Sequence, residues 1–305
     1  MFKIETYTWL DDREEIVIIN QNKQIYVSIL PSLGGILNGY KIHDVEVIDG
    51  ISLDQNGIDD YLSAYKSAFL TPFPNRIAGG KFEYNSQNHQ LECNEKSLGN
   101  ALHGFVYDKP FTVSSKLITN SSASVELSYD YDGKTDGFPY PFQLVLRYKV
   151  ESSGWLICTC IITNSGENVM PFGSGWHHYF SLNQPIDDLE LSFHPAEHWQ
   201  MNDKMIPTGQ KTSIGPVEGR IGGNTYDDCF TLEEQFVRLK DGEDNQLLLD
   251  LGKDFPFLQI YTPPHRKSIA IEPMTCPPDV FNNREKLIEI LPGQNGVFEF
   301  SMLIE

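Results

Sequence analysis

The stretch from Gln143 to Val150 reads QLVLRYKV, and four residues later the stretch from Trp155 to Ile162 reads WLICTCII. In the first stretch polar and apolar side chains alternate. Alternation with a period of two places the apolar side chains on one face of a β-strand and the polar ones on the other. The intervening residues, ESSG, are typical of a turn. The two stretches together have the pattern of antiparallel sheet.

The same pattern recurs along the chain. Short runs rich in Val, Ile, Leu, Tyr and Phe are separated by Gly, Asn, Asp, Ser or Pro, and each run predicts a strand. The further runs are Glu15 to Ile19, Ile25 to Leu30, Ser124 to Tyr129, Gln246 to Leu251, Phe257 to Tyr261 and Val297 to Leu303. Many strands and few helices indicate an all-β sandwich or barrel.

Helical periodicity is scarce in the sequence. The best candidate is the short segment Tyr61 to Ala68, and no alternation of strands and helices suggests a parallel α/β sheet. The chain contains no shift in composition, no linker rich in Pro, Gly or Ser, and no internal repeat. We therefore expect one large antiparallel β domain that spans residues 1–305.

The charge balance bears on the partners of the protein. The chain has 23 Lys and Arg against 42 Asp and Glu, a formal net charge of -19. Proteins that bind nucleic acid draw most of their affinity from cations that neutralise phosphates. The acidic field therefore argues against nucleic acid and, more weakly, against a phosphorylated substrate, and it favours a neutral ligand.

Targeting signals are not evident in the sequence. The segment Met1 to Glu15 mixes charged and apolar residues and lacks the apolar region of a signal peptide, and no run of 18 apolar residues predicts a membrane span. An odd number of cysteines without paired spacing is typical of free thiols in a reducing compartment. They are Cys93, Cys158, Cys160, Cys229 and Cys276. We expect a soluble cytoplasmic protein, as a monomer or homodimer.

One segment formally matches a zinc motif. His194 to His198 reads HPAEH, the H-x-x-E-H pattern that requires both histidines on one face of a helix. Pro195 removes a helical N–H and disfavours helical geometry at His194, and the surrounding Asp188 to Trp199 has the pattern of a strand entering a turn. We therefore expect no metal here.

Other cofactor motifs are missing from the sequence. Cys158 and Cys160 lack the second pair that a zinc site needs, and they are expected to be buried, inert thiols. Neither a phosphate-binding G-x-x-x-x-G-K-[ST] nor a dinucleotide-binding G-x-G-x-x-G occurs. We expect no metal and no other cofactor.

A set of polar residues remains where predicted strands meet turns. The set is Asn75, Arg76, His103, His177, His178, Asp227 and Glu272. Each one alone has a structural explanation, such as a turn cap or an internal ion pair. His177 and His178, if they lie in a strand, point to opposite faces, so at most one reaches a given pocket.

Glu272 is the most informative of these residues. It follows the apolar run from Ser268 to Ile271 and precedes Pro273, so its carboxylate is expected to end a strand and to be partly buried. Burial raises the pKa of a carboxyl group, which suits a general base. From the residues alone, a structural and a catalytic role for Glu272 both stay open.

At these residues the chain resembles the aldose 1-epimerase family, whose members interconvert the α and β anomers of free sugars. The matching segments occur in the order of the family and span most of the chain. They are PNRIAGGKF (Pro74 to Phe82), LHGF (Leu102 to Phe105), HHYF (His177 to Phe180), IPTG (Ile206 to Gly209), YDDCF (Tyr226 to Phe230) and IEP (Ile271 to Pro273).

The resemblance implies a fold and a set of roles. The fold is a large antiparallel β-sandwich, the galactose mutarotase-like supersandwich, with a cleft across one sheet. His177 is the general acid, because the family has a His followed one residue later by Tyr-Phe. Glu272 is the general base and His103 assists at the ring oxygen. The substrate-binding residues are Arg76, Asn75 and Asp227.

The implied chemistry is ring opening and reclosure of a small-molecule sugar. The base takes the proton of the C1 hydroxyl while the acid protonates the ring oxygen, which opens the hemiacetal to an aldehyde. Rotation about the C1–C2 bond and reclosure give the other anomer. Because no redox step and no leaving group is involved, proton transfer alone is sufficient.

The sequence departs from the better-known galactose mutarotases around the sugar site. Trp176 and Ser181 replace an Asn on each side of the acid motif, and Phe105 replaces a second Gly after His103. The preferred aldose is therefore open. Trp176 either stacks on a sugar or fills the core, and a large aromatic side chain favours the core.

Two alternatives to a free-sugar mutarotase remain. A hexose-6-phosphate mutarotase of the same fold needs a basic cluster near C6 of the sugar, and the sequence has no concentrated group of Lys and Arg. A non-catalytic sugar-binding protein would keep the fold. The presence of His103, His177 and Glu272 together argues against that alternative.

Overall fold

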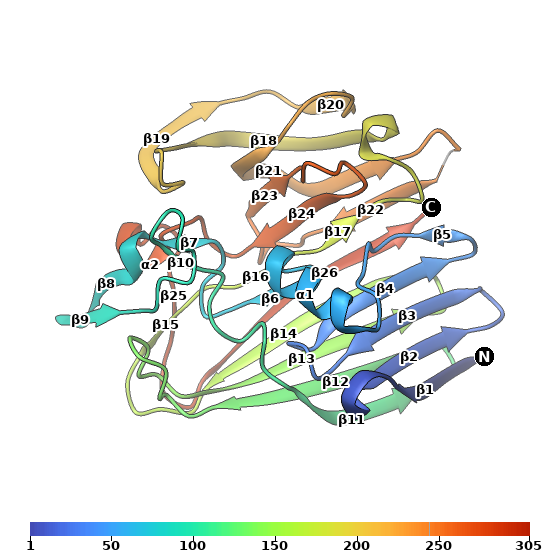
Figure 1. The fold of residues 1–305 in the computed structure, drawn as a ribbon, viewed down its shortest axis with the longest axis horizontal. Coiled ribbons are helices and arrows are strands. Elements are labelled where there is room, and N and C mark those ends of the chain that lie inside the picture. Colours follow the sequence, from blue (N-terminus) through green and yellow to red (C-terminus); the bar gives the residue numbers. More distant parts are fainter. Residues whose placement is uncertain (244) are drawn as a thin grey trace.

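A computed structural model describes residues 1–243 and 245–305 of the chain. Within these residues β-strands predominate, and two large antiparallel sheets carry most of the structure (Figure 1). The fold class predicted from the alternating pattern, all-β with large antiparallel sheets, is therefore confirmed. Helices are few and short.

The smaller of the two large sheets is built from the N-terminal part of the chain. Its strands follow one another in space as they do in sequence, and every neighbouring pair is antiparallel. They are β1 (Phe2–Thr8), β2 (Glu14–Asn20), β3 (Ile25–Leu30), β4 (Ile36–Ile42) and β5 (Val45–Glu46).

The larger sheet runs in the order β11-β12-β13-β14-β26-β22-β21-β23-β24-β16-β6. Strand β17 also pairs with β24, and β18 extends the sheet from β21 and carries β19 and β20. The bounds are β6 (Phe69–Leu70), β11 (Thr112–Ile118), β12 (Ser122–Tyr131), β13 (Phe142–Glu151), β14 (Leu156–Asn164), β16 (Gly175–Trp176), β17 (Tyr179–Phe180), β18 (Glu190–Met201), β19 (Pro207–Ser213), β20 (Val217–Arg220), β21 (Asp227–Lys240), β22 (Gln246–Asp250), β23 (Phe257–Tyr261), β24 (Ile269–Met274) and β26 (Asn295–Ile304).

Among the described residues, three two-stranded sheets lie outside the two large sheets. They are β7 (Arg76–Ile77) with β10 (Ala101–Leu102), β8 (Lys81–Tyr84) with β9 (Gln87–Gln90), and β15 (Met170–Phe172) with β25 (Ile288–Ile290). The described residues also contain three single 3₁₀ turns, η1 (Leu10–Asp12), η2 (Ala78–Gly80) and η3 (Ile186–Asp188).

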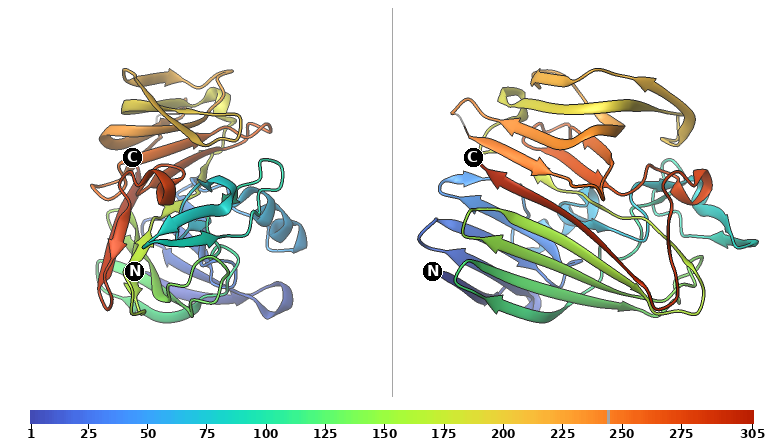
Figure 2. Two further views of the ribbon diagram at one scale, coloured as in Figure 1. Left: turned by 90° about the vertical axis from the view of Figure 1, so that its left-hand side faces the viewer. Right: turned by 180° about the vertical axis from the view of Figure 1, so that it is seen from behind.

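The two large sheets pack face to face as the layers of a sandwich (Figure 2). In β13 every second residue is buried, from Phe142 to Val150, as the alternation of this stretch predicts. Two tyrosine hydroxyls connect the layers, because Tyr40 donates to the carbonyl of Gly154 at 2.6 Å and Tyr148 donates to the carbonyl of Gly35 at 2.7 Å. Each buried hydroxyl thus finds an acceptor inside the core.

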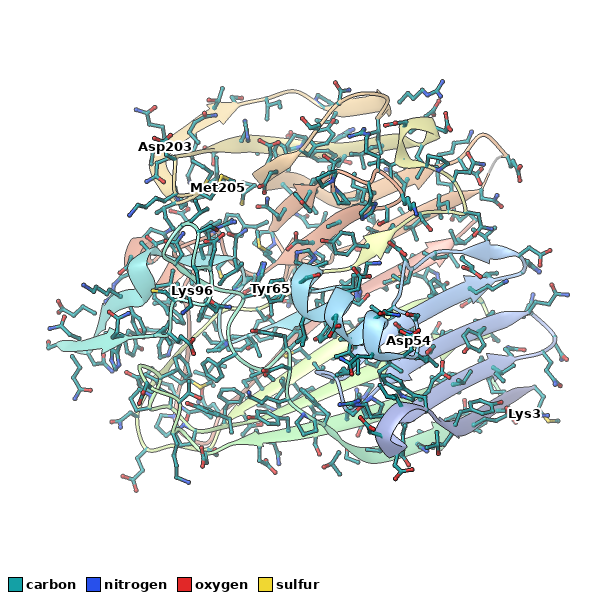
Figure 3. All side chains as sticks on the ribbon, in the orientation of Figure 1. Lys3, Asp54, Tyr65, Lys96, Asp203 and Met205 are labelled. Carbon is teal, nitrogen blue, oxygen red and sulfur yellow. The ribbon has the colours of Figure 1, made fainter. Side chains whose placement is uncertain are left out.

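The principal helix differs from the prediction. The sequence predicts a helix from Tyr61 to Ala68, whereas α1 spans Gln55–Ala64 and the remaining short helix, α2, spans Val280–Asn283. Asp54 caps α1 by accepting from the backbone N–H of Gly57, and Tyr65 ends it in a left-handed conformation (Figure 3). The error arises because the cap, rather than apolar periodicity, sets where this helix begins.

The zinc-like motif lies in an extended strand. His194 and His198 belong to β18, so they do not share a helical face. His198 contacts the carboxylate of Asp228 at 2.7 Å, and His194 lies between two glutamates of neighbouring strands. Among the described residues no group of His, Cys, Asp or Glu is arranged to hold a metal ion.

All five cysteines are free thiols, and Cys158 and Cys160 are fully buried in β14, as predicted. Burial raises the pKa of both thiols well above the usual range, which keeps them protonated and unreactive. Among the described residues no helix is long and apolar enough to cross a membrane.

Trp176 and His178 belong to the core. Both side chains are fully buried, and their rings stack with centroids 5.6 Å apart and planes 21° apart. The expectation that Trp176 fills the core is therefore confirmed. Neither ring nitrogen of His178 has a hydrogen-bond partner among the described residues, and burial lowers its pKa to about 3.

Replacement of His178 by Phe should make the protein less sensitive to acid. The unfolded chain binds a proton at His178 with a pKa of about 6.5, but the folded protein does not, so stability is lost as the pH falls through 6.5. Between pH 7.5 and 5.5 this amounts to about 1.4 kcal/mol. Urea unfolding at both pH values should show that His178→Phe loses that much less stability than wild type. Equal losses in the two proteins would contradict this account.

Candidate active site

A polar cavity of about 490 Å³ opens beside β24 and α1. Side chains from the middle of the larger sheet line its floor, and residues that follow α1 line one of its walls. Every candidate residue except His178 lies in this lining, namely Asn75, Arg76, His103, His177, Asp227 and Glu272. The structure therefore brings together residues that are up to 197 positions apart in the sequence, since 272 − 75 = 197.

His177 lies at a break in the sheet. Strands β16 and β17 both pair with β24, and His177 and His178 form the gap between them. The backbone of His177 is held by two hydrogen bonds of 2.9 Å, one to the carbonyl of Ala68 and one from the N–H of Ser67. As predicted, the two histidines reach opposite sides. His177 lines the cavity and His178 enters the core.

Glu272 faces His177 from the interior of β24. The prediction that it ends its strand is wrong, because β24 continues through Pro273 to Met274. The strand tolerates Pro273 because its neighbour on one side is divided into β16 and β17. Atom Oε1 of Glu272 lies 3.4 Å from Nε2 of His177, and the side chain of Glu272 is 2 % exposed.

Burial acts on both members of this pair. It raises the pKa of Glu272 well above its usual range and lowers the pKa of His177 to about 4. Both shifts favour the uncharged forms, a carboxylic acid beside a neutral imidazole. Atom Oε2 of Glu272 and atom Nδ1 of His177 have no hydrogen-bond partner among the described residues. The two side chains therefore meet in their uncharged forms, 3.4 Å apart, in the lining of the cavity.

His103 is oriented by the backbone around it. The N–H of Asn75 donates to Nδ1 of His103 at 3.2 Å, so Nδ1 is unprotonated and the neutral ring carries its proton on Nε2. Burial lowers the pKa of His103 well below the usual range. His103 is thus a neutral hydrogen-bond donor. Asn75 and His103 both have positive φ angles, 55° and 63°.

A close backbone contact explains why the LHGF segment has glycine at position 104. Gly104 has a φ of 70°, and a Cβ at this position would lie 1.9 Å from the carbonyl oxygen of Thr71. Only glycine allows this approach. The close passage of residue 104 past Thr71 places His103 at the wall of the cavity.

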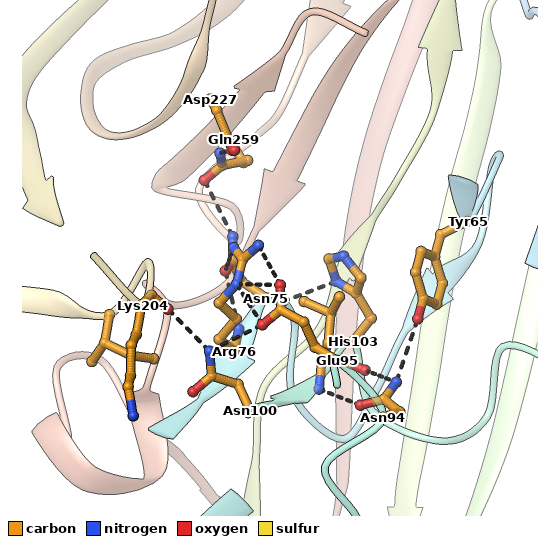
Figure 4. A network of polar contacts seen from close by, with 12 residues as sticks. Tyr65, Asn75, Arg76, Asn94, Glu95, Asn100, His103, Lys204, Asp227 and Gln259 are labelled. Carbon is orange, nitrogen blue, oxygen red and sulfur yellow. Dashed lines mark hydrogen bonds and ion pairs between the residues drawn. The ribbon is translucent and has the colours of Figure 1, made fainter. Parts of the chain in front are cut away.

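Arg76 is paired with Glu95, a residue that the sequence did not indicate as part of the site. Its guanidinium donates three hydrogen bonds of 2.9 to 3.1 Å to the carboxylate of Glu95. The Nη1 group donates to Oδ1 of Asn75 at 3.2 Å. Asn100 in turn donates to Glu95 and to the carbonyl of Lys204, both at 3.0 Å (Figure 4).

Gln259 connects Asn75 with Asp227. Its Oε1 accepts from the Asn75 amide at 3.2 Å, and its Nε2 donates to Asp227 at 3.0 Å. It stands directly opposite Glu272 in the pairing of β23 with β24. Asp227 lies at the exposed edge of the cavity. The floor of the cavity is therefore a continuous polar network (Figure 4).

Lys66 and Tyr65 form the wall that follows α1. The ammonium group of Lys66 lies 3.3 Å from Asp49 and 3.0 Å from Asp60. The ring of Tyr65 contacts His103 edge-on with centroids 4.8 Å apart. In Figure 4 Tyr65 and Arg76 lie on opposite sides of His103.

Sequence reasoning missed Gln259, Glu95, Tyr65, Lys66 and Asp60. Gln259 carries a usable signal, because it interrupts the apolar strand Phe257–Tyr261 as Glu272 interrupts Ile269–Met274. The others carry none. Charged residues in a short helix, or in the loop after β9, ordinarily indicate a solvated surface.

The arrangement is suited to proton transfer. A carboxyl group and an imidazole lie within reach of one small ligand, and a neutral histidine donor stands beside them. The surrounding amides, carboxylates and cations offer both donors and acceptors, as a ligand with many hydroxyl groups requires.

Comparisons with known proteins identify the family and the fold. The family model for aldose 1-epimerase matches residues 16–302. The crystal structure of a galactose mutarotase-like protein from Clostridium acetobutylicum has a TM-score of 0.91 and 20% identity, covering 100% of this chain and 98% of that one. That of galactose 1-epimerase from Lactobacillus acidophilus NCFM has a TM-score of 0.83 and 17% identity, covering 100% and 98%.

A curated relative shows the same likeness in sequence. The uncharacterized protein YihR of Escherichia coli strain K12 is 26% identical over 240 residues, which is 76% of each chain. The family model covers nearly the whole chain, from β2 to β26, and the two solved structures share its fold. The protein belongs to the aldose 1-epimerase family.

Proposed function

We propose that the protein is an aldose 1-epimerase that interconverts the α and β anomers of a free, uncharged aldose. The observation that carries the proposal is the buried pair of Glu272 and His177, 3.4 Å apart at the floor of a polar cavity. Mutarotation requires one group that accepts a proton and one that donates a proton, both acting on oxygens bonded to C1 of the sugar.

In the proposed mechanism Glu272 removes the proton of the C1 hydroxyl while His177 protonates the ring oxygen. The bond between C1 and the ring oxygen breaks, and C1 becomes an aldehyde. After rotation about the C1–C2 bond, Glu272 returns its proton to the aldehyde oxygen as the ring oxygen attacks C1 and gives its proton to His177. Each residue ends in its initial protonation state.

His103 supports the same step as a hydrogen-bond donor. Because Nδ1 accepts from the backbone of Asn75, the proton on Nε2 is available to the ring oxygen, where negative charge develops as the ring opens. The sugar hydroxyls would bind to Asn75, Arg76 and Asp227.

The charges of the cavity favour a free sugar over a sugar phosphate. Arg76 and Lys66 are both paired with carboxylates, and Asp60, Asp227 and Glu272 also line the cavity. A phosphate group would lie near several carboxylates. This argues against the hexose-6-phosphate alternative. The complete acid–base pair argues against a non-catalytic sugar-binding protein, which would have no need to bury it.

Replacement of Glu272 by Gln should slow mutarotation by roughly 10²- to 10⁴-fold, the usual contribution of a positioned general base. The amide keeps the shape of the carboxyl group, so the fold and sugar binding should remain. Polarimetry of freshly dissolved glucose, galactose and xylose measures the rate, with a chelator present. Glu299→Gln, a strand glutamate outside the cavity, is the matched control. A variant as fast as wild type would refute the assignment.

Replacement of His177 by Asn should lower kcat and leave KM nearly unchanged, because proton donation to the ring oxygen occurs in the transition state. His194→Asn, which lies outside the cavity, should behave like wild type. Initial rates over a range of sugar concentrations separate the two parameters. If only KM rises, His177 is a binding residue instead of the acid.

A further inference from the structure

Two cationic side chains reach the cavity from different walls. Arg76 and Lys66 both line it, and their side chains are only 14% and 11% exposed. Two buried cations would ordinarily make a strong site for an anionic ligand, because electrostatic attraction increases when water is excluded. Neither cation is free to do so here.

Glu95 neutralises Arg76. The carboxylate occupies two N–H groups of the guanidinium, because Nε–H is shared between Oε1 and Oε2 and Nη2 donates to Oε1, in a geometry that phosphate oxygens would otherwise occupy. The side chain of Glu95 is itself 11% exposed and is fixed by Asn100, which is bonded to the carbonyl of Lys204. The orientation of Arg76 is therefore determined by the protein before a ligand arrives.

Two aspartates neutralise Lys66. Asp49 lies 3.3 Å from the ammonium group and accepts a hydrogen bond of 2.6 Å from Ser268. Asp60, at 3.0 Å, is 49% exposed and reaches Lys66 from α1 at the edge of the cavity. The two networks, around Arg76 and around Lys66, have no residue in common.

The charged side chains in and around the cavity therefore have a negative net charge. The two cations are paired with three carboxylates, Glu95, Asp49 and Asp60, and Asp227 lies beside them. Uncharged hydroxyl groups can bind to both members of each ion pair, since they donate and accept hydrogen bonds. An anion would have to displace a carboxylate or approach one closely.

We propose that Glu95 and Asp60 determine the selectivity of the cavity for uncharged over anionic sugars, by neutralising Arg76 and Lys66. The inference rests on the proposed function and extends it, because it identifies the residues that exclude the anionic class. It predicts that loss of Glu95 leaves Arg76 without a paired carboxylate, and that loss of Asp60 leaves Lys66 with Asp49 alone. Either change should make the cavity more favourable for a phosphorylated sugar.

The test compares glucose with glucose 6-phosphate in Glu95→Gln and Asp60→Asn. Mutarotation of each sugar is followed by polarimetry in a buffer without phosphate, and the ratio of kcat/KM for the phosphate to that for glucose is the readout. Glu95→Gln should raise this ratio roughly 10-fold or more, given the strength of charge pairs at a partly buried site. Asp60→Asn should raise it by a smaller factor, because Asp60 is 49% exposed and Asp49 still pairs with Lys66. The increase should shrink at high ionic strength.

Two controls separate local from general effects. Asp59→Asn changes the net charge equally, but Asp59 is an exposed residue of α1 outside the cavity lining, so the ratio should not change. Glu95→Asp keeps the negative charge and should keep the ratio of wild type even if its shorter side chain weakens sugar binding. A ratio that rises equally in Asp59→Asn would overturn the proposal.

The remaining outcomes also decide the question. If both Glu95→Gln and Asp60→Asn turn over glucose but keep the ratio of wild type, the proposal is wrong. If Glu95→Gln loses activity on both sugars, the result for Asp60→Asn decides alone. If the wild-type protein catalyses mutarotation of no free aldose, the proposed function fails first, and this outcome is distinct from an unchanged ratio.

Discussion

The polar cavity is arranged around one buried contact, the 3.4 Å approach of Glu272 to His177. Burial alone favours the carboxylic acid and the neutral imidazole, which is the protonation state that the pair would reach after a sugar ring has opened. The proposed reaction of a ring-closed sugar starts from the opposite state, with the proton on His177. The two states differ by the position of one proton and have the same total charge. The charged state costs the desolvation of both groups, and their mutual attraction at 3.4 Å offsets part of that cost.

Regular strand pairing positions Glu272, and an interruption of the sheet positions His177. Glu272 lies inside β24, a central strand that cannot shift without disrupting the pairing with β23. His177 lies outside regular strand pairing. A continuous strand in place of β16 and β17 would pair its backbone with β24. The division into β16 and β17 frees the segment at His177 and anchors it to Ala68 and Ser67 instead. Asn75 and His103 adopt left-handed conformations beside it. Strained conformations of this kind persist where the surrounding structure enforces them.

The sequence predicted those parts of the molecule that depend on local patterns. The strand pattern predicted the bounds of the strands at Gln143 to Val150 and at Ile25 to Leu30 to within one residue. The segments that match the family contain six residues predicted for the site, and all six line the cavity. The helix boundary was wrong because it depends on the cap at Asp54. Glu95 and Lys66 could not be identified because their importance lies in ion pairs between distant segments. Lys66 and Asp49 are 17 residues apart, since 66 − 49 = 17, and nothing in their local sequence distinguishes this pair from solvated charges.

The outer ion pairs and the inner proton are electrostatically connected. The positive charge of Arg76 lowers the pKa of Glu272 and thereby opposes the larger effect of burial, while the negative charge of Asp227 raises it. Glu95 compensates part of the charge of Arg76 and so limits how far the guanidinium can stabilise the carboxylate form of Glu272. A fully unpaired Arg76 would favour a carboxylate at Glu272 and leave it a weaker base. In the proposed mechanism, the contact between Arg76 and Glu95 thus adjusts the charge that a sugar meets and, through the same guanidinium, the basicity of Glu272.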